Sequence, residues 1–168
     1  NMSHEIRTPL NGIIGFSQLL MNSNLEGNQL EFMNTINESA GSLMQIVNDV
    51  LDFSEIESGK LHLNIEENNL YELAGQTVNL FKYQASQKDI ELILTIDKNV
   101  PQFIFIDAFR IKQVLVNLIS NALKFTSVGE IKFDITAIES EIENHVTVQF
   151  SVIDTGMGIK KSIQKNIF

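Results

Sequence analysis

A histidine followed directly by a carboxylate, His4-Glu5, is the first candidate for chemistry in this chain of 168 residues. A neutral imidazole nitrogen is a competent nucleophile toward phosphorus and forms a covalent phosphoramidate. Glu5 could accept a hydrogen bond from the other ring nitrogen, which fixes the tautomer and keeps the attacking nitrogen unprotonated. Thr8 lies four residues after His4 and therefore on the same face of a helix. The pair alone is weak evidence for a catalytic role, because exposed histidines on helices are common and usually have no chemical function.

A second candidate is a polar stripe on a predicted helix that begins at Phe109. At 100° per residue the stripe covers an arc of roughly 80°. Its members are Arg110, Gln113, Asn117, Asn121 and Lys124. Amide oxygens suit magnesium, which keeps water and phosphate as its other ligands, and a lysine can place a point charge on a phosphate. An amphipathic helix that exposes its polar side to water is the alternative explanation.

A third candidate follows a run of β-branched residues and reads Asp154-Thr155-Gly156-Met157-Gly158. A carboxylate in this position can accept a hydrogen bond from an adenine amino group. Gly156 and Gly158 let the backbone approach a ring closely and adopt positive φ. The two glycines match neither the dinucleotide-binding fingerprint nor a phosphate loop of the Gly-Lys-Ser type, so they carry little weight alone.

Hydrophobic periodicity predicts a helical hairpin at the N-terminal end. Residues 1–21 have helical spacing, and a heptad seam runs from Met33 to Val50. The polar run Asn22-Ser23-Asn24 and Gly27 separate the two segments, which predicts an antiparallel pair. A hairpin is too thin to bury both sides of its apolar stripe. A second copy that completes a four-helix bundle is the natural remedy, and packing on the rest of the same chain is the alternative.

The remaining chain alternates between strand and helix patterns, which predicts an α+β domain. We expect a first domain over 1–59 and a second over 60–168. The predicted elements of the second domain are strands at 61–65, 91–96, 103–106, 131–138 and 146–153, and helices at 70–87 and 109–125.

Composition excludes several classes of protein. The net charge of −9 argues against a nucleic-acid partner, because phosphate binding needs a basic surface. No apolar run approaches the roughly 20 residues that span a bilayer, and no signal peptide is visible. The absence of cysteine excludes disulfides and thiolate metal sites, and it fits a reducing compartment.

Taken together and in this order, the motifs resemble those of the sensor histidine kinases of two-component signalling. Ser3 to Asn11 resembles the phosphoacceptor box, Asn117 to Phe125 the asparagine box, and Asp154 to Gly158 the first glycine box. Asn166 to Phe168 is similar to the start of the phenylalanine box, and Glu57 to Leu61 to the junction between hairpin and catalytic domain. The resemblance covers essentially the whole chain.

In the hairpin, the resemblance implies that His4 is the phosphorylated residue and Glu5 its general base. Thr8 resembles the residue that orients water when the enzyme removes phosphate from its partner.

In the second domain, the resemblance implies an ATP site with magnesium. Asn121 matches the magnesium ligand, with Asn117 close by as a second candidate. The other implied nucleotide contacts are Lys124 at a phosphate, Phe125 near the adenine, Asp154 as the adenine-reading carboxylate, and the glycines Gly156 and Gly158.

The implied fold is half of a dimeric four-helix bundle followed by a Bergerat-type α/β sandwich. The implied partners are a second copy, through the hairpin, and an aspartate of a response-regulator receiver domain. The implied location is the cytoplasmic portion of a membrane-anchored bacterial sensor, with membrane contact only through segments outside this chain.

The chain departs from the family pattern at both ends. It begins just before His4, and it stops at Phe168, before the family's lid and second glycine box. We therefore expect an incomplete triphosphate clamp and poor activity of this segment alone. Two alternatives remain: a non-catalytic phosphorelay and dimerisation module, which leaves Asn121 and Asp154 unexplained, and an ATPase of the wider GHKL group, which leaves the hairpin without a purpose.

Overall fold

The computed structural model describes residues 2–23, 25–139 and 145–164; at residues 2–5, 139 and 161 it describes the backbone alone. The chain divides into two compact units, residues 1–62 and 63–168. None of the described helices is long and apolar enough to cross a membrane. The expected start of the phenylalanine box and the expected turn at 140–144 lie outside the described residues.

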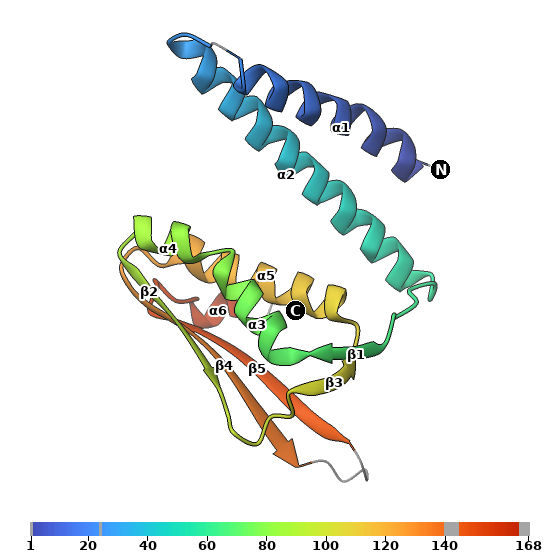
Figure 1. The fold of residues 1–168 in the computed structure, drawn as a ribbon, viewed down its shortest axis with the longest axis vertical. Coiled ribbons are helices and arrows are strands. Elements are labelled where there is room, and N and C mark those ends of the chain that lie inside the picture. Colours follow the sequence, from blue (N-terminus) through green and yellow to red (C-terminus); the bar gives the residue numbers. More distant parts are fainter. Residues whose placement is uncertain (1, 24, 140–144, 165–168) are drawn as a thin grey trace. The chain divides into compact units, whose positions relative to one another are not determined.

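The first unit is a hairpin of two helices, α1 (Met2–Met21) and α2 (Asn28–Glu57), which confirms the predicted hairpin (Figure 1). Pro9 lies inside α1, so the helix neither begins nor ends there. Among the described side chains of this unit, those of Leu10, Ser17 and Ala40 are buried. The Arg7 guanidinium also donates a hydrogen bond to the Asn48 side-chain oxygen, at 3.4 Å.

The second unit is a sheet covered on one face by helices, as Figure 1 shows. The sheet has the order β2-β4-β5, with β2 parallel to β4 and β4 antiparallel to β5. A separate antiparallel pair joins β1 to β3. The strands are β1 (Glu66–Asn69), β2 (Ile90–Ile96), β3 (Phe103–Ile106), β4 (Gly129–Glu139) and β5 (Val146–Asp154). The helices are α3 (Leu70–Asn79), α4 (Lys82–Gln87), α5 (Ala108–Phe125) and the short α6 (Lys161–Gln164).

The core of this unit lies between the helices and the central strand. Alternate residues of β4 point inward, and Ile131, Phe133 and Ile135 are fully buried. Phe133 stacks on Phe150 of β5, with ring centroids 6.4 Å apart. Leu115 and Ile119 of α5 belong to the same buried cluster.

Two sequence predictions about this unit are wrong in detail. The predicted strand at 61–65 does not form, and the strand begins at Glu66, because only residues 66–69 find pairing partners on β3. The predicted helix over 70–87 is interrupted at Leu80 and Phe81. Phe81 nevertheless lies in the buried core, on the face that helical spacing predicts from Leu73, Thr77 and Val78, so the turn does not change which side of the segment is buried.

Asp107 fixes the start of α5. Its Oδ1 accepts a hydrogen bond from the Arg110 backbone amide at 3.0 Å, and its Oδ2 accepts one from the Asn64 amide at 2.9 Å. The first bond satisfies an otherwise unpaired amide of the first helical turn. Backbone hydrogen bonds from Arg110 and then Asn64 hold the pKa of the Asp107 carboxyl below its ordinary value of 3.8.

We expect Asp107→Asn to lower the melting temperature of the chain at neutral pH, because the amide lacks the charge that strengthens both hydrogen bonds. Since the folded-state pKa is the lower one, ionised Asp107 contributes stability above the unfolded pKa, and this contribution is lost as the pH falls through the folded pKa. The difference in melting temperature between the two proteins should therefore be constant above about pH 5 and shrink below it. Thermal unfolding followed by circular dichroism measures it.

The matched control is Glu67→Gln, which changes an exposed carboxylate on β1. It should leave the melting temperature close to that of the wild type. A difference for Asp107→Asn that persists unchanged down to about pH 3 would contradict the role assigned to its charge.

Candidate functional site

One side of α5 is buried in the core and the other is open. Leu115, Ile119, Ala122 and Leu123 are buried, whereas Asn117, Asn121 and Lys124 are exposed. The helix therefore turns Asn117, Asn121 and Lys124 of the predicted polar stripe outward, whereas Arg110 and Gln113 of the same stripe are half-buried. Within the stripe, the Asn121 amide nitrogen lies 3.5 Å from Asn117 Oδ1, and Arg110 donates to Gln113 Oε1 at 3.0 Å.

Lys124 is the last residue of the stripe, and Phe125 follows it at the C-terminal end of α5. The Lys124 ammonium lies over the Phe125 ring, 5.3 Å from its centroid, a cation–π contact. The ring itself is half exposed, at 50%. A cation and an aromatic face are thus presented together at the end of the helix.

Asp154 ends β5 on the face of the sheet that the helices cover. It pairs in register with the buried Ile131 and shares strand parity with Val152 and Phe150, which pack on the core. Its Oδ1 accepts a hydrogen bond from the Gly156 amide at 2.8 Å. The carboxylate is exposed, so it is available to a ligand at this end of the sheet.

The loop after Asp154 is bound to the end of α5. The Met157 amide donates to the Phe125 carbonyl at 3.3 Å. A Cβ at Gly156 would overlap the same carbonyl oxygen and lie 2.8 Å from Asp154 Oδ1. Gly158 has a φ of +65°, which favours glycine. These contacts bring the Asp154 loop against Lys124 and Phe125 at the end of α5, although 28 residues lie between Phe125 and Asp154 in the chain.

A neighbouring hydroxyl was missed by sequence reasoning. Thr126, directly after α5, is 1% exposed, and its Oγ1 has no hydrogen-bond partner in the described part of the chain. A buried hydroxyl of this kind costs about 1–3 kcal/mol unless a water or a ligand satisfies it. A threonine that directly follows the polar stripe was the only sequence signal available.

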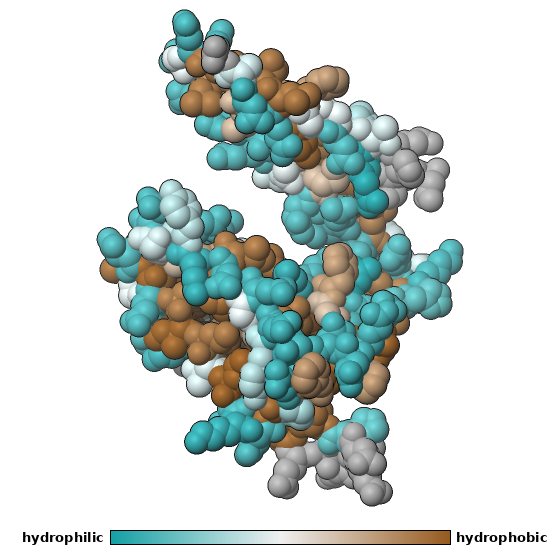
Figure 2. Space-filling model, viewed as in Figure 1, coloured by the Kyte–Doolittle hydropathy of each residue, from teal (hydrophilic) through white to brown (hydrophobic). Residues whose placement is uncertain are grey.

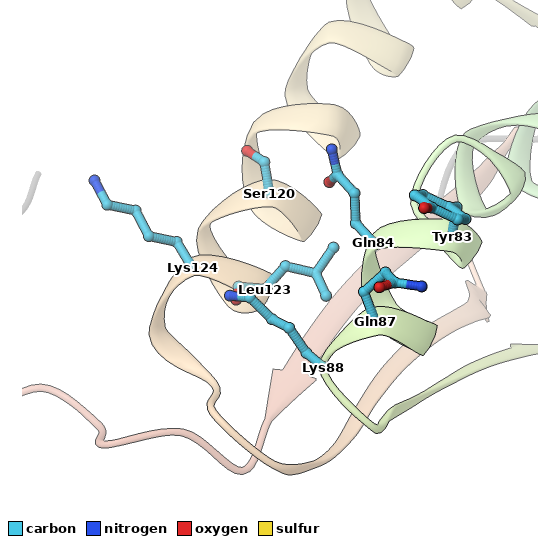
Figure 3. Close-up of a pocket in the computed structure, with 7 residues that line it drawn as sticks. All are labelled: Tyr83, Gln84, Gln87, Lys88, Ser120, Leu123 and Lys124. Carbon is cyan, nitrogen blue, oxygen red and sulfur yellow. The ribbon is translucent and has the colours of Figure 1, made fainter. Parts of the chain in front are cut away.

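A cavity of about 400 Å³ lies between α4 and α5, beside the stripe (Figure 3). Its lining residues are Tyr83, Gln84, Gln87, Lys88, Ser120, Leu123 and Lys124. Lys88 is engaged, since its ammonium donates to the Leu123 carbonyl at 2.7 Å, and Figure 3 shows the Lys124 ammonium pointing away from the other six side chains. Asn117, Asn121 and Asp154 do not line this cavity. The candidate site lies outside this cavity, on the open rim formed by Asn117, Asn121, Lys124 and the Asp154 loop.

The donor set on this rim suits a magnesium ion that is already bound to phosphate. Among the described residues, no group of three His, Cys, Asp or Glu side chains could hold a metal by itself. Two amide oxygens one helical turn apart, on Asn117 and Asn121, can supply part of an octahedral shell that phosphate and water complete. The residues present therefore fit a metal delivered with its ligand.

In the hairpin, the structure places the backbone of His4 and Glu5 in α1. Thr8 is exposed one helical turn later. Residues at this spacing share a helix face, so His4 and Thr8 lie on one side of α1.

Two family models match the chain. The His Kinase A (phospho-acceptor) domain matches residues 1–59. The family described as Histidine kinase-, DNA gyrase B-, and HSP90-like ATPase matches residues 106–168.

Curated relatives align with the chain from end to end. Sensor histidine kinase GacS of Pseudomonas protegens is 44% identical over 168 residues, which are 100% of this chain and 18% of GacS. Signal transduction histidine-protein kinase BarA of Escherichia coli strain K12 is 41% identical over 169 residues, again 100% of this chain and 18% of BarA. The chain thus spans less than a fifth of the length of these relatives.

Solved structures with the same fold include full-length ShkA in complex with AMPPNP. That match has a TM-score of 0.77 and 34% identity, and it covers 96% of this chain and 34% of ShkA. Histidine kinase ThkA, in complex with the response regulator protein TrrA, matches with a TM-score of 0.60 and 28% identity over 99% of this chain and 47% of that one.

We expect Gly156→Ala to push the Asp154 loop away from α5, because the added Cβ would overlap the Phe125 carbonyl oxygen. The Met157 amide should then lose its hydrogen bond and exchange with solvent faster, as measured by hydrogen exchange followed by NMR. Gly75→Ala in α3 is the control, since a Cβ there meets nothing within 4 Å. Unchanged protection of Met157 in Gly156→Ala would show that the loop is not held by this close approach.

Proposed function

This chain belongs to the sensor histidine kinases, and from that membership we propose that it transfers the γ-phosphoryl group of ATP to His4 and then to an aspartate of a response-regulator receiver domain. The observation that carries the proposal is the junction of α5 with the Asp154 loop, where the Met157 amide meets the Phe125 carbonyl. This contact brings the amides of the stripe, the Lys124 ammonium and the exposed Asp154 carboxylate onto one rim. Each of these groups suits a different part of ATP.

At the nucleotide end, Asp154 accepts a hydrogen bond from the adenine amino group. Gly156 and Gly158 leave room for the ring to approach the backbone, and the exposed Phe125 ring packs near it. The AMPPNP in the ShkA complex supports a nucleotide of this kind.

At the phosphate end, Asn121, with Asn117 beside it, holds the magnesium ion, and Lys124 contacts a phosphate oxygen. A magnesium ion held by these residues would neutralise the charge that develops during transfer. The chain's own contribution is positioning, because phosphoryl transfer needs little covalent chemistry from the protein.

At the hairpin end, a ring nitrogen of His4 attacks the γ-phosphorus. The new N–P bond forms as the bond between the γ-phosphorus and the β–γ bridging oxygen breaks, and ADP leaves. Glu5 accepts a hydrogen bond from the other ring nitrogen and takes up the proton that the imidazole must release. Thr8, on the same face of α1, orients water when phosphate is removed from the partner.

We propose that the hairpin dimerises. Within the seam, Ala40 is buried, whereas Ile36, Leu43 and Val50 remain 44%, 49% and 59% exposed. The surface in Figure 2 carries apolar side chains between polar ones along the hairpin. An exposed apolar stripe at heptad spacing is typical of a helix that packs on another copy, and two hairpins complete a four-helix bundle. The match to the phospho-acceptor domain supports this assembly.

The receiver-domain partner is proposed by analogy with ThkA, which is known in complex with its response regulator. The receiver would dock on the hairpin, where His4 lies. We place the reaction in the cytoplasm, where ATP is available to it.

In a full-length protein that contains this segment, we expect His4→Gln to abolish phosphate incorporation from ATP while leaving nucleotide affinity nearly unchanged, because His4 lies in the hairpin and the nucleotide contacts lie in the other unit. Asn121→Ala should lower the rate by on the order of a hundredfold or more, because it removes an electrostatic contact to the transferring group. Intact-mass measurement after incubation with ATP and magnesium, before and after acid treatment, follows the phosphate.

Acid treatment identifies the bond, since a phosphoramidate is lost in acid whereas a serine or threonine ester survives. Gln45→Ala, an exposed change in α2, is the control and should retain full incorporation. Acid-labile phosphate on His4→Gln would contradict the assignment of the nucleophile. Full-length wild-type protein that accepts phosphate only from a phosphorylated receiver, and not from ATP, would favour the relay alternative.

A further inference from the structure

Thr155 joins the loop that follows Asp154 to the start of β4. Its hydroxyl accepts a hydrogen bond from the Glu130 amide at 3.1 Å and donates one to the Glu130 carbonyl at 3.3 Å. The Thr155 amide donates to the same carbonyl at 3.2 Å. Ile131 and Asp154 form the last pair in the register of β4 and β5. Thr155 and Glu130 therefore extend the pairing by one position, and the Thr155 side chain makes two of the three hydrogen bonds.

Gly129 provides the space that the Thr155 side chain occupies. A Cβ at Gly129 would overlap Thr155 Oγ1 and lie 3.4 Å from Thr155 Cβ. Gly129 also has a φ of +118°, a backbone conformation that residues other than glycine rarely adopt. The hydroxyl is therefore fixed by hydrogen bonds to Glu130 and by close packing on Gly129.

This arrangement determines the direction of the Asp154 carboxylate. Asp154 lies between its strand pairing with Ile131 and the anchored Thr155. One carboxylate oxygen, Oδ1, is already engaged by the Gly156 amide at 2.8 Å. With both neighbours of Asp154 held and one oxygen engaged, the second oxygen keeps one direction relative to the sheet.

We propose that Thr155 is a positioning residue that sets the discrimination between adenine and guanine nucleotides by holding the Asp154 carboxylate. Adenine presents an amino donor at the position where guanine presents a carbonyl acceptor, so a fixed carboxylate accepts a hydrogen bond from the first and repels the second. A carboxylate free to turn aside loses both effects. This inference rests on the proposed function, because it takes Asp154 as the adenine contact.

The test compares Thr155→Val, which removes the hydroxyl and keeps the branched shape, with Thr155→Ser, which keeps the hydroxyl. Dissociation constants for non-hydrolysable analogues of ATP and GTP, with magnesium, are measured by NMR titration, which also reports weak binding. Thr155→Val should weaken the adenine analogue by about tenfold and leave the guanine analogue unchanged or slightly tighter. Thr155→Ser should restore most of the wild-type preference.

Gly129→Ala tests the same contact from the opposite side, because the new methyl would displace the Thr155 hydroxyl. It should lower the preference for adenine in the same way as Thr155→Val. Hydrogen exchange of the Phe133 amide in β4 checks that each variant keeps its core.

The possible negative results distinguish a failure of this inference from a failure of the proposed function. A wild-type preference for adenine that survives in Thr155→Val overturns the inference alone. Equal weakening of both analogues also overturns it, since a purely structural residue would have that effect. The same titration of a full-length wild-type protein that contains this segment tests the proposed function: binding of neither analogue, or equal binding of both, overturns the proposed function and with it this inference.

Discussion

The packing of one side of α5 on the inner face of the β2-β4-β5 sheet is the constraint on which the candidate site depends. Leu115 and Ile119 lie in the same buried cluster as Ile131, Phe133 and Ile135 of β4. Burying several large apolar side chains, each worth about 1.5–3 kcal/mol, fixes the rotation of the helix about its axis. Once that rotation is fixed, Asn117, Asn121 and Lys124 must face outward, and the Phe125 carbonyl must end beside the Asp154 loop.

The two ends of the proposed reaction lie in different units of the chain. His4 belongs to the 1–62 unit, and the nucleotide contacts belong to the 63–168 unit. In the proposed reaction, the phosphoryl group therefore passes from a nucleotide bound by one unit to a histidine of the other.

Features set by local periodicity could be predicted from the sequence, and features set by distant partners could not. The length of α5 and its polar stripe could be predicted from the spacing of apolar and polar residues alone, and so could the hairpin. The strand at Glu66–Asn69 depends instead on its pairing with β3. The turn at Leu80 and Phe81 could not be predicted, because the helical spacing of the buried residues continues across it. Likewise, Thr155 stands inside a recognisable motif, but its partner Glu130 is 25 residues away, so its role emerges only from the fold.

The central claim is that the outward stripe of α5 and the Asp154 loop form one nucleotide site. Photoaffinity labelling with 8-azido-ATP and magnesium, followed by peptide mapping, tests it most directly, because the azide reacts beside the adenine. The account predicts labelling confined to the segments around Phe125 and around Asp154 to Gly158, and suppressed by excess ATP. Labelling of α4 around Tyr83 to Lys88, where the neighbouring cavity lies, with none in those two segments, would contradict it.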